Sequence, residues 1–178
     1  MSPLRQVWHL AKRFFGVLRS RPLGPGDQDE VRQALSREEA ALFWQQQFID
    51  QRHAYDVARR VDQATGNADA KAAALLHDVG KSHSRLGPVG RSMATLLAAL
   101  RIPLPASWGR YRAHGELGAQ DLEAVGARPL AVAFAAGEAT GDRYVWDALV
   151  AADNGTRLLP KPGIDAETGN TMPSEVQK

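Results

Sequence analysis

Cysteine is absent from the 178-residue chain, which excludes disulfide bonds, thiolate metal sites and cysteine nucleophiles. The chain also lacks a Walker-type phosphate loop, a dinucleotide-binding glycine fingerprint and the nucleophile elbow of serine hydrolases. No apolar stretch is long and uninterrupted enough to span a bilayer or to serve as a secretory signal, so we expect a cytoplasmic protein. Any metal site in this sequence must therefore be built from histidine and carboxylate side chains.

An excess of positive charge is confined to one end of the sequence. The chain has 22 Lys and Arg residues against 20 Asp and Glu residues, a formal net charge of +2. Residues 1–26 hold five basic groups and no carboxylate, whereas residues 27–160 hold 15 basic and 17 acidic groups. Because the body is net acidic and the short arm supplies few phosphate contacts, we expect no specific nucleic-acid binding.

Apolar residues at spacings of three and four over residues 4–18 predict an amphipathic helix in the basic arm. We expect this helix to pack on the protein core, and contact with an anionic membrane surface is the open alternative. A linker rich in Pro and Gly, residues 21–26, ends the arm. At the other end, residues 160–178 are polar and without periodicity, which predicts a disordered tail.

Helical periodicity predominates between these ends, and no segment shows sustained two-residue alternation. We therefore predict a single all-α domain, a helical bundle over residues 27–159. Pro129 suits the first turn of one of its helices, where the missing N–H is not needed. The predicted helices cover residues 51–64, 70–76, 89–100, 115–125, 129–136 and 142–152.

Several residues mark where these helices begin and end. Ser36 and Glu39 have the spacing of a capping box in front of an apolar run. Asp50 and Asp69 are the candidate N-caps of the next two helices, because a short carboxylate accepts hydrogen bonds from the free N–H groups of a first turn. Gly66 is a stop signal between them.

Two ionisable residues, His77 and Asp78, end the most apolar helical run of the chain, residues 72–76. Burying both is costly unless something compensates them. A divalent cation would do so, because imidazole and carboxylate both donate to it and its charge keeps Asp78 ionised. The alternative is a helix that ends in water with both side chains solvated. His53, on an apolar helix face, and Asp153, at the end of another apolar helix, are ambiguous when taken alone.

The order of these residues resembles that in the HD superfamily of metal-dependent phosphohydrolases, and small stand-alone bacterial HD proteins are the closest likeness. The likeness covers residues 45–155 and is carried by Asp50-Gln-Arg-His53-Ala-Tyr-Asp-Val57, Ala73-Ala-Leu-Leu-His-Asp-Val-Gly-Lys81, Tyr111-Arg-Ala-His-Gly-Glu-Leu-Gly118 and Ala148-Leu-Val-Ala-Ala-Asp153. It implies an HD-domain helical bundle with one divalent metal ion, Mn, Fe, Mg, Co or Zn. The implied metal ligands are His53, His77, Asp78 and Asp153.

The resemblance also implies roles for residues around this set. His114 matches a histidine that binds a second metal in two-metal members. The additional histidine of those members is missing from residues 135–142, where Glu138 is the candidate substitute. Asp78 would also orient the nucleophile, and Lys81 would contact a phosphate oxygen. For Lys81, a solvated lysine at a helix end is the alternative.

The activity implied by the resemblance is hydrolysis of a phosphate ester of a nucleotide or related small molecule by metal-activated water. A symmetrical dinucleoside tetraphosphatase is one alternative. A non-catalytic HD domain that binds metal or nucleotide as a regulator is another, and Glu138 in place of a histidine favours it. His83 is a candidate acid or substrate contact, with a surface loop residue as the alternative. Arg52 and Arg143 are candidate phosphate contacts, with a structural role as the alternative for each.

Overall fold

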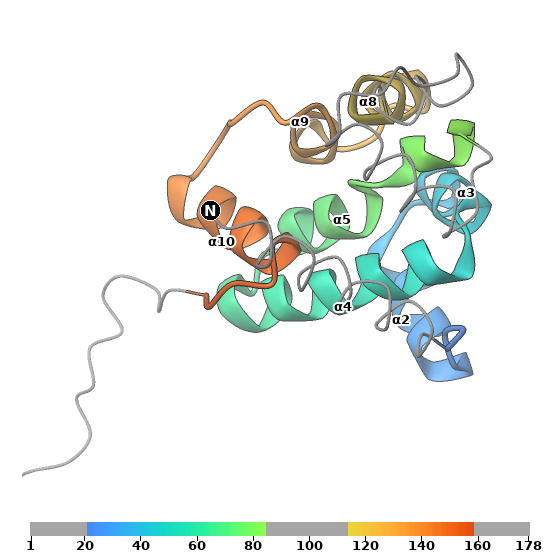
Figure 1. The fold of residues 1–178 in the computed structure, drawn as a ribbon, viewed down its shortest axis with the longest axis horizontal. Helices are drawn as coiled ribbons and strands as arrows, with labels where there is room; N and C mark the ends of the chain where they lie inside the picture. The colour runs from blue at the N-terminus through green and yellow to red at the C-terminus, as the bar shows by residue number, and fades with distance from the viewer. Residues whose placement is uncertain (1–20, 85–113, 159–178) are drawn as a thin grey trace, which may run out of the picture.

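The computed structural model describes residues 21–84 and 114–158, and these residues form an all-α fold without strands (Figure 1). The predicted helices over residues 4–18 and 89–100 and the predicted tail, residues 160–178, lie outside the described residues. None of the described helices combines the length and apolar character needed to cross a membrane. The elements are α2 (Pro25–Ala34), α3 (Arg37–Gln45), α4 (Phe48–Thr65), α5 (Ala68–Leu76), the 3-10 helix η1 (Val79–Ser84), α8 (His114–Ala124), α9 (Pro129–Ala136) and α10 (Arg143–Asp153).

The helix α5 lies at the centre of the fold, packed against α4, α9 and α10 (Figure 1). Gly66, with a φ of 60°, ends α4 and donates its N–H to the carbonyl of Asp62, so that the chain reverses into α5. Glycine suits this left-handed position because it has no Cβ to clash. The Ala-rich sequence of α5 lets three helices approach closely, and its five consecutive buried residues, 72–76, lead directly into His77 and Asp78.

One hydrophobic core joins the described helices. In α4 the predicted apolar face is confirmed, since Val57 and Val61 are buried. The buried residues of α10 follow the same helical spacing and face α4 and α5. The largest fully buried side chains come from seven different elements and are Phe43, Leu75, Leu76, Leu122, Leu149, Val31, Val61 and Val79.

The predicted capping box of α3 is confirmed, and the two predicted aspartate caps are wrong. The Glu39 N–H donates to Ser36 Oγ at 3.1 Å, and the Ser36 N–H donates to Glu39 Oε2 at 2.9 Å. Asp50 is not a cap: α4 begins at Phe48, which places this carboxylate inside the first turn. Asp69 is not a cap either, because the side chain of Asn67 accepts the Ala70 N–H at 3.0 Å.

The predicted linker over residues 21–26 is too long, and the predicted domain start at residue 27 falls inside α2. Pro25 and Gly26 form the first turn of this helix, where proline needs no hydrogen-bond partner for its nitrogen. The extended residues before them are held by Arg52, which donates to the carbonyls of Arg21 and Pro22. Further along the chain, α9 has the predicted bounds, and α8 and α10 each differ from theirs by one residue at either end.

Candidate metal centre

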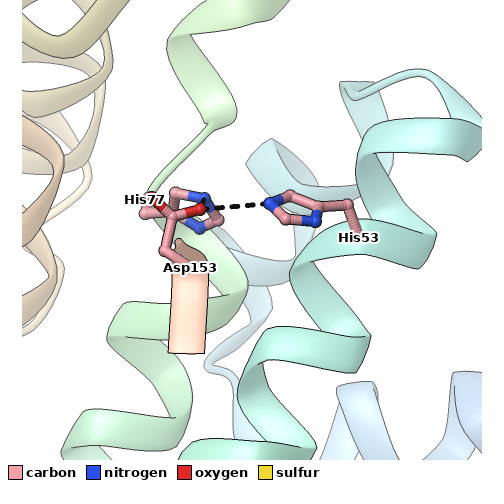
Figure 2. A group of neighbouring side chains, drawn as sticks. All are labelled: His53, His77 and Asp153. Carbon is pink, nitrogen blue, oxygen red and sulfur yellow. Dashed lines mark hydrogen bonds and ion pairs between the residues drawn. The ribbon is translucent and has the colours of Figure 1, made fainter. Parts of the chain in front are cut away.

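Three side chains from three different helices meet at one point (Figure 2). His53 lies on α4, His77 is the C-cap of α5, and Asp153 is the last residue of α10. Asp153 Oδ1 is 3.1 Å from His53 Nε2 and 3.3 Å from His77 Nε2. One ligand atom from each residue lies within 4.8 Å of the other two. Three of the four ligands implied by the likeness, His53, His77 and Asp153, therefore lie together, although residues 53 and 153 are far apart in the sequence. The fourth, Asp78, is not part of this group of convergent ligand atoms and lies beside it, with Oδ2 3.3 Å from His77 Nε2.

The packing of α10 on α4 brings Asp153 to His53. Tyr144, in the first turn of α10, donates its hydroxyl to the carbonyl of Ala64 near the end of α4, at 2.9 Å. Asp153, at the end of α10, lies against His53, toward the start of α4. The two helices are therefore antiparallel, and the buried Leu149 of α10 contributes to the core between them.

The ring of His77 has a defined orientation. Its Nδ1 lies 2.9 Å from the carbonyl oxygen of Ala74, and because a carbonyl only accepts, Nδ1 must carry a hydrogen. In the neutral ring Nε2 is then a bare lone pair. This Nε2 is buried without a hydrogen-bond partner, and it faces Asp153 Oδ1 and Asp78 Oδ2 at 3.3 Å each. A lone pair between two carboxylate oxygens is repulsive unless a positive charge lies among them.

The electrostatics of the site point to the same need for positive charge. Burial lowers the pKa of His77, but the negative charges of Asp78 and Asp153 outweigh it and raise this pKa to about 10. The pKa of Asp78 lies well below its usual value, because His77 and Lys81 overcome the effect of burial. The hydrogen bond from His53 and the nearby ring of His77 lower the pKa of Asp153. A proton on His77 therefore balances the carboxylates, and a cation would replace it.

The donor set fits a divalent cation of the first transition row. Histidine nitrogens and a carboxylate oxygen suit Mn, Fe, Co and Zn, and a histidine ligand commonly donates its second nitrogen to a backbone carbonyl, as His77 does to Ala74. Ligands of a cation about 2.0–2.2 Å away lie roughly 3.0–3.5 Å from one another. The distances of 3.1 Å and 3.3 Å from Asp153 to the two rings fall in this range.

His77 and Asp78 do not end their helix in water. His77 is 9% exposed and Asp78 is 3% exposed, so the solvated alternative for this pair is wrong. Lys81 Nζ forms an ion pair with Asp78 Oδ2, the same oxygen that faces His77. The Lys81 side chain is 16% exposed, so the solvated alternative for this residue is wrong as well. Asp78 thus has cationic partners on two sides.

Of the two predicted ligands of a second metal, His114 lies near Asp78, whereas Glu138 is exposed to solvent. His114, the first residue of α8, places its Nε2 4.0 Å from Asp78 Oδ1. Glu138 is exposed in the turn after α9. Among the described residues, neither belongs to the group of convergent ligand atoms that His53, His77 and Asp153 form. A second metal at His114 and Glu138 stays a prediction.

A close contact between η1 and α8 brings His114 toward Asp78. A Cβ at Gly80 would lie 1.9 Å from the carbonyl oxygen of His114 and 2.6 Å from the nitrogen of Gly118. A side chain at Gly118 would in turn meet the backbone of Gly80 at 3.0 Å. Two facing glycines therefore allow the backbones to touch, and this contact fixes the start of α8 beside the His77–Asp78 turn.

Three further candidates from the sequence lie outside the cluster of convergent ligands. His83 Nε2 pairs with Asp121 Oδ2 at 2.6 Å, which ties η1 to α8. Arg52 pairs with Asp27 and holds the segment before α2, so its role is structural. Arg143 is 93% exposed and lies 3.6 Å from the carboxylate of Asp147 on the surface of α10.

An aromatic wall beside His77 has no distinct signal in the sequence. The ring of Phe134 on α9 lies 5.7 Å from that of His77, between ring centroids. Trp146 on α10 packs edge-on against Phe134 at 5.4 Å. The apolar run that predicts α9 contains Phe134, but helical periodicity alone does not say which apolar residue touches a functional group. The wall covers one side of the His77 ring.

Comparisons of the chain with protein-family models, with curated proteins and with solved structures found no match. The chemistry of the site is therefore interpreted from its own distances, burial and charges.

Proposed function

We propose that the chain is a metal-dependent phosphohydrolase of the HD type, acting on a phosphate ester of a nucleotide or related small molecule. One observation carries this proposal: the buried Nε2 of His77 has no hydrogen-bond partner and faces two carboxylate oxygens at 3.3 Å. His53, His77 and Asp153 would hold one divalent cation, with Asp78 as the neighbouring carboxylate. When bound, such a cation supplies a water of lowered pKa and neutralises charge on phosphate oxygens.

The residues of the proposed metal site differ in exposure: two are buried and two are partly open to solvent. His77 and Asp78 are buried, whereas the side chains of His53 and Asp153 are 40% and 38% exposed. A small phosphate ester can therefore approach from the side of α4 and α10. The Ala74 carbonyl keeps the His77 ring in one tautomer, so that Nε2 faces the site throughout.

Asp78 and Lys81 have complementary roles in this proposal. Asp78 stays ionised because its pKa is far below the usual value, so it accepts a hydrogen bond from the attacking water and orients that water. Lys81 lies beside it and brings a positive charge with several N–H donors. An ammonium at this position can donate to a non-bridging phosphate oxygen while it still contacts Asp78.

A non-catalytic domain that binds metal or nucleotide as a regulator is the second candidate. The exposure of Glu138 favours it, because the described residues then lack a complete ligand set for a second metal. A single cation suffices for binding, and hydrolysis of phosphate esters is often assisted by two. The two candidates share the metal centre and differ only in turnover.

Phosphate release distinguishes the candidates. The purified protein is incubated with Mn²⁺ and a panel of nucleoside monophosphates, nucleoside triphosphates and a symmetrical dinucleoside tetraphosphate. We expect turnover of at least one monophosphate or triphosphate, and a loss of about 100-fold or more in Asp78→Asn. Asp147→Asn is the matched control, because Asp147 lies on the exposed side of α10 and pairs only loosely with Arg143.

Three other outcomes of this assay would overturn the proposal or part of it. Full activity in Asp78→Asn would show that the assigned site is wrong. Turnover of the dinucleoside tetraphosphate alone would identify the symmetrical tetraphosphatase. Tight Mn²⁺ binding without release of phosphate from any substrate would exclude the enzyme and leave the regulator.

A further inference from the structure

Arg60 contacts the end of the helix that carries Asp153. It lies on α4, seven residues after His53 and therefore on a similar face of the helix. Arg60 Nη1 donates to the carbonyl of Ala152 at 2.7 Å, and Nη2 donates to the carbonyl of Thr156. One guanidinium thus joins α4 to the last turn of α10 and to the chain that leaves it.

The end of α10 needs such a partner for two reasons. The last carbonyls of a helix have no N–H partner within the helix, and the C-terminus carries a partial negative charge. Turn hydrogen bonds satisfy part of this need, since Gly155 donates to Ala152 and Thr156 donates to Ala151. Arg60 supplies a full positive charge and a planar fork whose two donors reach two carbonyls at once.

We propose that Arg60 is a positioning residue for the metal centre: by holding the last turn of α10 it fixes Asp153 between His53 and His77. This inference rests on the proposed metal site. Asp153 directly follows Ala152, whose carbonyl Arg60 holds, so a shift of that peptide moves the Cα of Asp153 with it. The distances at stake are the 3.1 Å and 3.3 Å from Asp153 Oδ1 to the two imidazoles.

Other contacts hold the remainder of α10. Val145 and Leu149 are buried in the core, and Tyr144 donates to the carbonyl of Ala64 at the opposite end of the contact with α4. Loss of Arg60 therefore leaves the helix docked and frees its last turn. The expected consequence is a weaker metal site in a protein that is still folded, which separates a positioning role from a general contribution to stability.

The test compares three variants of the full chain. Arg60→Ala removes both hydrogen bonds, and Arg60→Lys keeps the charge but loses the planar fork. Arg59→Ala is the matched control, because it removes the same charge from an exposed neighbouring position of α4. The first readout is the dissociation constant of Mn²⁺ by titration calorimetry. The second is the set of imidazole NMR signals of His53 and His77 in the metal-free protein.

We expect Mn²⁺ binding about 10–100-fold weaker in Arg60→Ala, a smaller loss in Arg60→Lys, and less than twofold change in Arg59→Ala. The ring signals of His53 and His77 should move in Arg60→Ala and stay in place in Arg59→Ala. Equal Mn²⁺ affinity in Arg60→Ala and Arg59→Ala would overturn the inference. If Arg60→Ala does not fold, Arg60→Lys decides in the same way, and parental affinity in that variant counts against a positioning role.

The failure of the proposed metal site would look different. A parent chain that takes up no Mn²⁺ refutes that site whatever the variants do. The imidazole signals then decide the role of Arg60 alone: a shift in Arg60→Ala supports it, and unchanged signals in a folded variant overturn it.

Discussion

Raising the pH from 6.5 to 8.5 is expected to strengthen Mn²⁺ binding to this protein about 100-fold. The reason is competition for one atom, His77 Nε2. Nδ1 of this ring carries a hydrogen that it donates to the Ala74 carbonyl, so the additional proton of the charged ring lies on Nε2, which faces Asp78 and Asp153. A metal ion binds this nitrogen only after the proton has left.

The magnitude follows from the pKa of His77, which is raised to about 10. Below this pKa, each pH unit increases the fraction of neutral imidazole about tenfold, so two units change the apparent dissociation constant about 100-fold. The same shift affects stability. An unfolded histidine has a pKa of about 6.5, so the metal-free protein loses stability as the pH rises from there toward 10. Stability that depends on Asp78 and Asp153 is lost instead as the pH falls below their usual pKa.

Titration calorimetry with Mn²⁺ at several pH values measures this competition. Repeating each titration in two buffers with different ionisation enthalpies counts the protons released, and we expect close to one per metal ion. His77→Gln is the control: an amide does not titrate, so its weaker binding should vary little with pH. A change of less than about threefold between pH 6.5 and 8.5 in the parent, with no proton released, would refute the role of His77.

Three further predictions address the fold and the number of metal ions. Gly80→Ala places a Cβ 1.9 Å from the His114 carbonyl, so η1 and α8 must separate, and urea unfolding should show a loss of about 3 kcal/mol or more; parental stability would contradict the contact. Ser36→Ala removes the cap of α3 and should cost about 1 kcal/mol in the same assay, whereas no change would mean that the cap is not formed in solution. Glu138→Gln should leave one Mn²⁺ per chain, because Glu138 is exposed away from the convergent ligands; a drop from two ions to one would identify it as a ligand.

The helix boundaries that could be predicted are those with strong local chemistry. The capping box of Ser36 and Glu39 and the proline at the start of α9 act within a few residues of themselves, so the sequence alone indicates them. The N-terminal caps of α4 and α5 are not determined by local sequence alone. Asp50 and Asp69 have side chains that can cap, but each lies in the first turn of its helix, because packing of α4 and α5 in the core decides where each helix starts.

Parts of the candidate site depend on contacts that no local pattern contains. A family likeness predicts the ligands His53, His77, Asp78 and Asp153 from their order in the chain, and the structure brings three of them together, with Asp78 beside the group. The contact of Arg60 with Ala152 joins residues 92 positions apart, so it follows only from the antiparallel packing of α4 and α10. Lys81 is another example, since its pairing with Asp78 depends on the tight 3-10 turn of η1.

Anomalous X-ray diffraction from crystals grown with Mn²⁺ tests the metal centre most directly. The account predicts a single strong peak within about 2.0–2.3 Å of His53 Nε2, His77 Nε2 and Asp153 Oδ1. A peak elsewhere, or no peak with His77 Nε2 still facing both carboxylates, would contradict it.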